Sequence, residues 1–156
     1  MNIYLRLSIA ATVIILATFS VAQAQEKKIK REQLPPAVER TVAEQSQGAT
    51  IRGFSTEIEN GRRLYEVELT TNGHGKDISM DRTGKIVEVE EEVSMDSLPE
   101  AVQDGLKKAA GAGTIGKIES LTKRGKLVAY EAHVKTGTKR SEVQVGPNGE
   151  KLKHPE

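Results

Sequence analysis

Apolar and polar residues alternate along two short stretches that lie 65 positions apart. Leu64–Leu69 reads Leu-Tyr-Glu-Val-Glu-Leu, and Ala129–Val134 reads Ala-Tyr-Glu-Ala-His-Val. A period of two turns one set of side chains toward a core and the other toward solvent, as in a half-buried β-strand. Each stretch lies in the middle of a longer segment with the same order of features. The sequence therefore predicts a tandem repeat.

Each repeat unit is predicted to begin with a short amphipathic helix. Leu34–Val38 and Leu98–Val102 share the pattern Leu-Pro-x-Ala-Val at a spacing of 64 residues. Proline is tolerated in the first helical turn, because its missing N–H would have no partner there. Apolar residues then recur at helical spacing. Ser97, with Glu100 three residues later, predicts a capping box at the start of the second helix.

Four strands are predicted after each helix. The segments are 50–59, 62–71, 76–81 and 85–93 in the first unit, and 114–122, 126–136, 138–145 and 150–153 in the second. Asn60-Gly61 is a strong hairpin signal, because both central positions of a type I′ turn need positive φ. One extra residue in 126–136 predicts a β-bulge. The predicted fold class is α+β: a tandem repeat in which each unit has one helix packed on a four-stranded antiparallel meander sheet.

The amino terminus has the layout of a secretory signal peptide. A positive region precedes an apolar run, Leu7–Phe19, and the small residues Ala22-Gln23-Ala24 follow. A bilayer span needs about 20 apolar residues, so cleavage near Ala24 is predicted, with an uncleaved anchor as the alternative. The expected location is periplasmic or secreted, with membrane attachment only through an uncleaved signal.

The remaining chain divides into a spacer and two modules. Residues 25–33 are predicted to be a charged, solvated and mobile spacer. The modules cover residues 34–96 and 97–156, and the tail 154–156 is expected to fray. A unit of about 60 residues buries only about 60% of its unfolded surface. The modules are therefore expected to pack together, through a shared core or a continuous sheet.

Composition and charge exclude several function classes. The chain has no cysteine, which excludes thiol catalysis, thiolate metal sites and disulfides. Tryptophan is absent and aromatic residues make up 3% of the chain, so stacking platforms for bases or sugars are few. The formal net charge of +1 argues against a nucleic-acid binder.

The two modules differ in charge. Residues 34–96 hold 7 basic and 13 acidic side chains, a balance of −6, whereas residues 98–156 hold 11 and 7, a balance of +4. One interpretation is divergence of two surfaces after duplication. The other is that the halves face each other or meet a partner of matching polarity.

The sheet face opposite the helices is the candidate binding surface. Its predicted residues are Glu66, Glu68, Glu88, Glu131, His133 and Lys135, with His74 in a glycine-rich loop tip. A plain solvated sheet face is the alternative. The histidines lack the short spacing of a zinc site, and carboxylates that alternate along strands diverge instead of converging on calcium. No catalytic residue, metal site or cofactor is predicted.

Three motifs resemble the PepSY-like domain family, including its β-lactamase-inhibitor-like group. They are the Leu-Pro-x-Ala-Val helix start, the Tyr-Glu-(Val/Ala) strand and the turn-plus-strand Asp81–Val87. The resemblance covers residues 34–153 as two copies, and the second copy departs from it at Gly146–Gly149. It implies an exported, non-enzymatic domain with a helix on an antiparallel sheet, related to propeptide modules that restrain proteases. It transfers no site residue.

The first functional hypothesis is an exported, non-catalytic protein-binding module. Its sheet face and its loop tips, residues 72–76 and 137–140, would engage a periplasmic or cell-envelope protein, restraining or inhibiting a hydrolase or protease. The alternative is an envelope sensing domain that binds a small molecule or cation between the modules. Nucleic acid is not an expected partner, and an enzyme is not expected.

Overall fold

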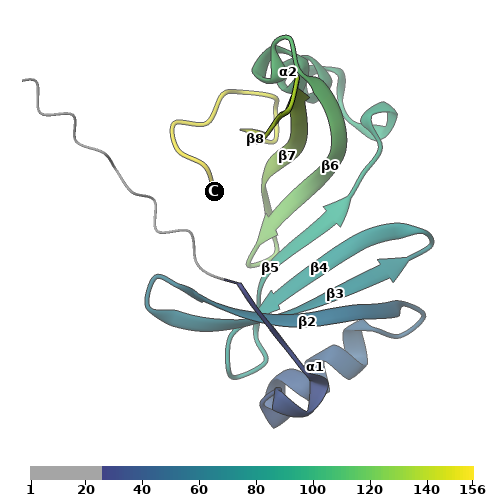
Figure 1. Ribbon diagram of the computed structural model, residues 1–156, viewed down its shortest axis with the longest axis vertical. Helices are drawn as coiled ribbons and strands as arrows, with labels where there is room; N and C mark the ends of the chain where they lie inside the picture. The colour runs from purple at the N-terminus through teal and green to yellow at the C-terminus, as the bar shows by residue number, and fades with distance from the viewer. Residues whose placement is uncertain (1–25) are drawn as a thin grey trace, which may run out of the picture.

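The chain forms one antiparallel sheet that carries two helices (Figure 1). The computed structural model describes residues 26–156, and the predicted signal peptide, residues 1–24, lies outside the described residues. The strands are β1 (Lys27–Ile29), β2 (Thr50–Glu59), β3 (Arg62–Thr71), β4 (His74–Met80), β5 (Ile86–Glu92), β6 (Thr114–Lys123), β7 (Lys126–Thr136) and β8 (Lys139–Val145). Each strand pairs with the next in chain order, which makes an eight-stranded meander.

Equivalent hairpins connect β2 to β3 and β6 to β7. The backbone has positive φ at Asn60 (49°) and Gly61 (74°), and again at Arg124 (51°) and Gly125 (78°). This confirms the hairpin predicted from Asn60-Gly61. The predicted bulge in β7 is also present, because Leu121 pairs with Ala129 but Thr122 pairs with Leu127.

The helices α1 (Pro36–Gln45) and α2 (Glu100–Ala110) each follow a short 3-10 turn. Proline caps the start of both helices, at Pro35 and Pro99. The capping box predicted from Ser97 is wrong. Its hydroxyl instead donates to the carbonyl of Ser94 at 2.7 Å within the preceding turn, and no side chain caps α2. Neither helix, nor any other in residues 26–156, is long and apolar enough to span a bilayer.

Each helix covers its own core. The first core gathers these buried residues: Leu34, Val38, Val42, Val67, Leu69, Ile78 and Met80. The second gathers Leu98, Val102, Leu106, Ile118, Ala132 and Val145. Tyr65 packs against the first core and Tyr130 against the second, so the two alternating stretches are equivalent in space. The two halves therefore share a sheet and keep separate cores.

The repeat extends to the way each helix touches a turn. Gly84 (φ 80°) lies against the carbonyl of Ala37 in α1, and Gly149 (φ 78°) lies against the carbonyl of Ala101 in α2. A Cβ at either glycine would overlap the helix backbone. Both turns thus need glycine for its positive φ and its lack of a side chain.

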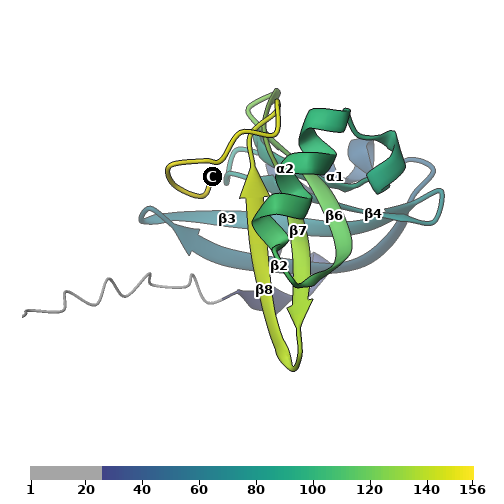
Figure 2. The ribbon, with the colours of Figure 1, turned by 90° about the horizontal axis from the view of Figure 1, so that it is seen from above.

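The pairing of β5 with β6 makes the sheet continuous from Glu88–Lys123 to Glu92–Glu119. Val89 packs against the first core and Val93 against the second, and both lie on the same side of one extended segment. Both helices therefore cover the same face. The sheet twists between its halves, so that β7 and β8 run crosswise to β2 and β3 (Figure 2). The helices lie on the outer side of this bend, and the C-terminal segment lies on the inner side (Figure 1).

Three predictions about the ends of the modules are wrong. The spacer 25–33 contains β1, because Ile29 packs against the first core and the strand pairs with β2. The second module has three strands, since the predicted strand 150–153 is reduced to one bridge between Val145 and Lys151. A tight turn, with Gly146 N donating to Glu150 O at 2.8 Å, leaves too few residues before Pro155 for a ladder. The tail is tethered, because the Glu156 N–H donates to Gln144 Oε1 at 2.8 Å.

Candidate functional site

The face of the sheet without helices carries most of the acidic side chains of the strands. Cross-strand register aligns them in rows, for example Ser55, Glu66, Ser79 and Glu88 across β2 to β5. We define the acidic face by these carboxylates: Glu57, Glu66, Glu68, Asp77, Glu88, Glu90, Glu119, Glu131 and Glu142. They come from both halves of the sheet, so the continuous pairing of β5 and β6 is what brings them onto one surface.

The acidic face is hollowed. A pocket of about 270 Å³ is lined by five carboxylates and a serine: Glu57, Glu66, Asp77, Ser79, Glu88 and Glu90. A wider hollow of about 1480 Å³ extends over Glu119, Glu131 and His133 to the C-terminal segment. The bend of the sheet thus turns flat strands into a concave surface.

Burial and mutual repulsion raise the pKa of several carboxyl groups on the acidic face. Burial, with repulsion from Asp77 and Glu26, raises the pKa of Glu66 from 4.5 to about 7. Burial, with repulsion from Glu119 and Glu88, raises the pKa of Glu90 to about 8. Burial likewise raises the pKa of the carboxyls at Glu57, Asp77, Glu88 and Glu131. Moving a carboxylate out of water without a cation is costly, so the neutral form gains.

Basic side chains neutralise only part of the acidic face. Lys28 Nζ lies 2.8 Å from Glu68, Lys123 Nζ lies 3.4 Å from Glu88, and an Arg52 nitrogen lies 3.2 Å from Asp77. In residues 26–156, neither Glu66 nor Glu90 has an ion-pair partner. The face therefore has room for cations supplied from outside.

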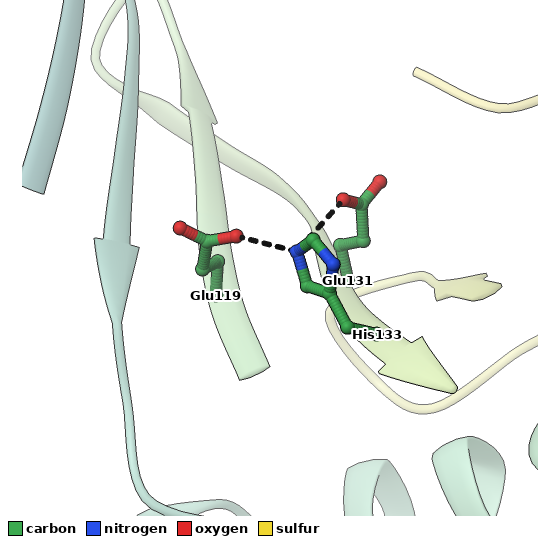
Figure 3. Close-up of side chains that lie close together, drawn as sticks. All are labelled: Glu119, Glu131 and His133. Carbon is green, nitrogen blue, oxygen red and sulfur yellow. Dashed lines mark hydrogen bonds and ion pairs between the residues drawn. The ribbon is translucent and has the colours of Figure 1, made fainter. Parts of the chain in front are cut away.

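In the second half the carboxylates gather around a histidine (Figure 3). Glu119 on β6 pairs with Glu131 on β7, and His133 follows two residues later on the same side of β7. His133 Nε2 lies 3.2 Å from Glu119 Oε2 and 4.0 Å from Glu131 Oε1. Glu119 is buried, with 4% of its surface exposed. Within residues 26–156, these three residues form one of two clusters with atoms spaced for a metal ion; the other is Asp77, Glu90 and Glu119.

Six of the seven predicted site residues lie on the helix-free side of the sheet: Glu66, Glu68, Glu88, Glu131, His133 and Lys135. Of these, Glu68 and Lys135 line neither hollow. His74 is exposed and also lines neither hollow. His74 begins β4 opposite Thr71, at a tight hairpin, and Lys135 pairs with Arg140 near the end of β7.

Sequence reasoning missed Glu119, which the structure places opposite Glu131. Glu119 belongs to no visible motif, and the nearest predicted site residue along the chain, Glu131, is 12 residues away. Only the register between β6 and β7 places it opposite Glu131. The signal that could have found Glu119 is the presence of an acidic residue on each strand of the predicted β6–β7 hairpin, since cross-strand neighbours lie close together.

Solved structures of similar fold come from several Bacteroides species. A DUF2874 family protein from Bacteroides ovatus is 18% identical, with a TM-score of 0.60 over 77% of this chain and 85% of that one. A protein from Bacteroides eggerthii, described as a putative periplasmic protein, is 14% identical, with a TM-score of 0.63 over 77% and 86%. A BLIP-like protein from Bacteroides fragilis is 19% identical, with a TM-score of 0.55 over 74% and 81%. These likenesses show a shared fold.

Sequence comparison places the chain in one family. No curated protein matches it. The family described as "Putative beta-lactamase-inhibitor-like, PepSY-like" matches residues 20–88 and again residues 63–152. Two matching segments agree with two copies of one unit, as the repeat of the alternating stretches predicted. The chain belongs to the PepSY-like family.

Proposed function

We propose that this PepSY-like chain is an exported, non-catalytic protein-binding module whose acidic face binds a cationic surface of a periplasmic or cell-envelope protein. The observation that carries the proposal is the concave, helix-free acidic face, which spans both halves of the sheet. A rigid sheet presents rows of side chains at fixed spacing, which suits recognition of another protein.

Charge complementarity indicates the partner's chemistry. Glu66 and Glu90 have no basic partner among the described residues, and their raised pKa values record how poorly the fold itself stabilises their charge. A lysine or arginine from a partner would supply the missing cation and displace the proton. Electrostatic complementarity of this kind also speeds association.

The family and fold relationships support a restraining role. The family is described as inhibitor-like and one similar structure as BLIP-like, while another is described as periplasmic. We propose that the partner is a hydrolase or protease whose activity falls when the acidic face covers it.

Site-specific photocross-linking in the periplasm tests this function. A photoreactive residue at Glu66, on the acidic face, should capture a defined protein. The same residue at Glu44, exposed on α1, is the matched control and should not capture it. If the captured protein is a hydrolase, adding the purified chain should lower its turnover. Equal capture from both positions would contradict the proposal.

A second candidate function is sensing of a cation in the envelope, which the cluster of Glu119, Glu131 and His133 favours. Thermal unfolding of the purified chain with divalent ions and small envelope metabolites tests it. A sensor should gain thermal stability from one of these ligands, because a ligand that binds only the folded state stabilises it. No gain from any of them would exclude this function.

A further inference from the structure

The side chains of Glu119, Glu131 and His133 converge on one point (Figure 3). We call these three residues the His133 cluster. Nε2 of His133 faces Oε2 of Glu119 and Oε1 of Glu131, at 3.2 and 4.0 Å. Ligand atoms that bind one zinc ion at 2.0–2.2 Å in tetrahedral geometry lie about 3.3 Å from one another. The distance to Glu119 is therefore close to that of a zinc site, and the distance to Glu131 is longer. A small rotation of the Glu131 side chain would shorten it.

Each of the two carboxylates is held by a second group on its outer side, and a further carboxylate lies near the outer nitrogen of His133. Lys117 Nζ lies 2.7 Å from the other oxygen of Glu119, Oε1. Gln144 Nε2 donates to the other oxygen of Glu131, Oε2, at 2.7 Å. The second ring nitrogen of His133, Nδ1, lies 3.6 Å from Glu142 Oε1. Metal-binding histidines and carboxylates have outer partners of this kind, which fix the ring orientation and direct the inner atoms at the ion.

The tautomer of His133 decides what the cluster can hold. With the ring proton on Nε2, the imidazole donates to Glu119. With the proton on Nδ1, toward Glu142, the Nε2 lone pair and the oxygens of Glu119 and Glu131 form a set of donor atoms for a metal ion. The surrounding face adds negative charge, and Lys117 is the basic group that opposes it at Glu119.

We propose that Glu119, Glu131 and His133 bind one divalent transition-metal ion of the zinc class, with Lys117, Gln144 and Glu142 orienting the three ligands. The imidazole nitrogen favours zinc over calcium or magnesium, which prefer oxygen ligands. The cluster borders the open hollow, so a fourth position is accessible to water or to a partner side chain. This inference rests on the second candidate function, cation sensing, and names its ion; it does not depend on binding of a protein partner, and binding of zinc without a gain in thermal stability would exclude sensing but not the site.

The neighbouring cluster of Asp77, Glu90 and Glu119 shares one residue with this site. It consists of carboxylates alone, and Arg52 already pairs with Asp77. The shared residue means that an ion at His133 lowers the negative charge next to Glu90, and thereby couples the second half of the face to the first.

Titration calorimetry with Zn²⁺ on the purified chain, carrying no affinity tag, tests the site. One ion should bind per chain, and Mg²⁺ and Ca²⁺ at the same concentrations should not compete. His133→Ala should abolish this binding. His74→Ala removes an exposed histidine outside the cluster and should leave the isotherm unchanged.

Two further variants separate ligands from orienting groups. Glu142→Gln should weaken zinc binding by about tenfold without abolishing it. Lys117→Gln should likewise leave binding of one ion in place, because Lys117 contacts Glu119 only through the oxygen that faces away from the cluster.

A wild-type measurement keeps the test independent of folding of the variants. In NMR spectra of the histidine side chains, Zn²⁺ should shift Nε2 of His133 and leave His74 in place. The inference is overturned by a zinc isotherm that His133→Ala does not alter, by calcium binding of equal affinity, or by a zinc-induced shift at His74 instead of His133.

Discussion

At the scale of single residues, the acidic face combines burial with missing counter-charges. Glu66 and Glu90 are half-buried, and neighbouring carboxylates repel both. By contrast, Asp81 in the β4–β5 turn accepts hydrogen bonds from Thr83, and these lower the pKa of its carboxyl. A carboxyl group is therefore stabilised as an anion where it closes a turn and destabilised where it lines the hollow. This contrast is the physical basis of the proposed binding of a cationic partner.

The raised pKa values of Glu66 and Glu90 predict that the free energy of unfolding falls as the pH rises from about 4.5 to about 8. The pKa values of Glu66 and Glu90 are raised to about 7 and about 8 in the folded state, so the folded state holds more protons than the unfolded state across that range. Stability is thus fullest at the acidic end of the window and is lost as these groups ionise.

Urea unfolding at pH 5.5 and pH 8.5 measures this slope. The double variant Glu66→Gln/Glu90→Gln should be more stable than wild type at pH 8.5 and should show a shallower slope, because neutral amides do not titrate. Glu44→Gln, on the exposed side of α1, should keep the wild-type slope. A chain that gains stability with rising pH over this window would contradict the prediction.

At the scale of elements, contacts between helix and turn hold each half together. Thr41 Oγ1 in α1 donates to the carbonyl of Gly84 at 2.8 Å. Gly105 takes the equivalent position in α2, and a Cβ there would overlap the carbonyl oxygen of Gly149. The second half therefore replaces a hydrogen bond with a close backbone approach. This explains a glycine in the middle of a helix, where alanine would otherwise be more stable by about 1 kcal/mol.

Gly105→Ala should consequently destabilise the chain, against the direction of helix propensity. Overpacking of this kind typically costs about 1–3 kcal/mol, and denaturant unfolding measures it. Lys107→Ala, on the exposed side of the same helix, should change stability by less than about 0.5 kcal/mol. A Gly105→Ala variant more stable than wild type would contradict this prediction, because it would mean that the turn at Gly149 shifts without a loss of stability.

Elements whose signals are local were predictable from the sequence. Asn60-Gly61 determines its hairpin through the φ values of two adjacent residues, and the alternation at Tyr65 and Tyr130 correctly gave the buried face of both strands. Errors arose where two local options compete. Ser97 had two backbone partners within reach, and the fold used the one in the 3-10 turn.

Features that depend on pairing between strands far apart in the sequence could not be predicted from local patterns. Ile29 looked like one apolar residue in a charged run until β2 supplied a partner strand and a core. Glu119 joined the site only through the register of β6 with β7, which two irregularities shift. Alternation alone assigns a side chain to a face, and it placed six of the predicted residues on the helix-free side of the sheet. Their convergence required the bend of the whole sheet.

At the scale of the whole molecule, duplication and continuity together create the site. The smaller pocket is lined by the first half alone, whereas the wider hollow is lined by both halves. Pairing of β5 with β6 joins the two sheets, and the bend between them makes one concave surface lined from both halves (Figures 1 and 2). The helices remain on the outer side and leave the inner side without a helix. The charge difference between the modules then places most of the negative charge at the end formed by the first half.

The affinity of the chain for the protein captured from position 66 tests this account most directly. Glu66→Lys/Glu90→Lys reverses charge on the acidic face, and Glu44→Lys makes the same change on α1. Removing and reversing charges at a buried interface typically costs more than about tenfold in affinity, and salt screens the effect. The account predicts that the double variant binds at least about tenfold more weakly at low salt, with a smaller difference at high salt, while Glu44→Lys binds as wild type. Unchanged binding by the double variant, with weaker binding by Glu44→Lys, would place the partner on the helices and contradict it.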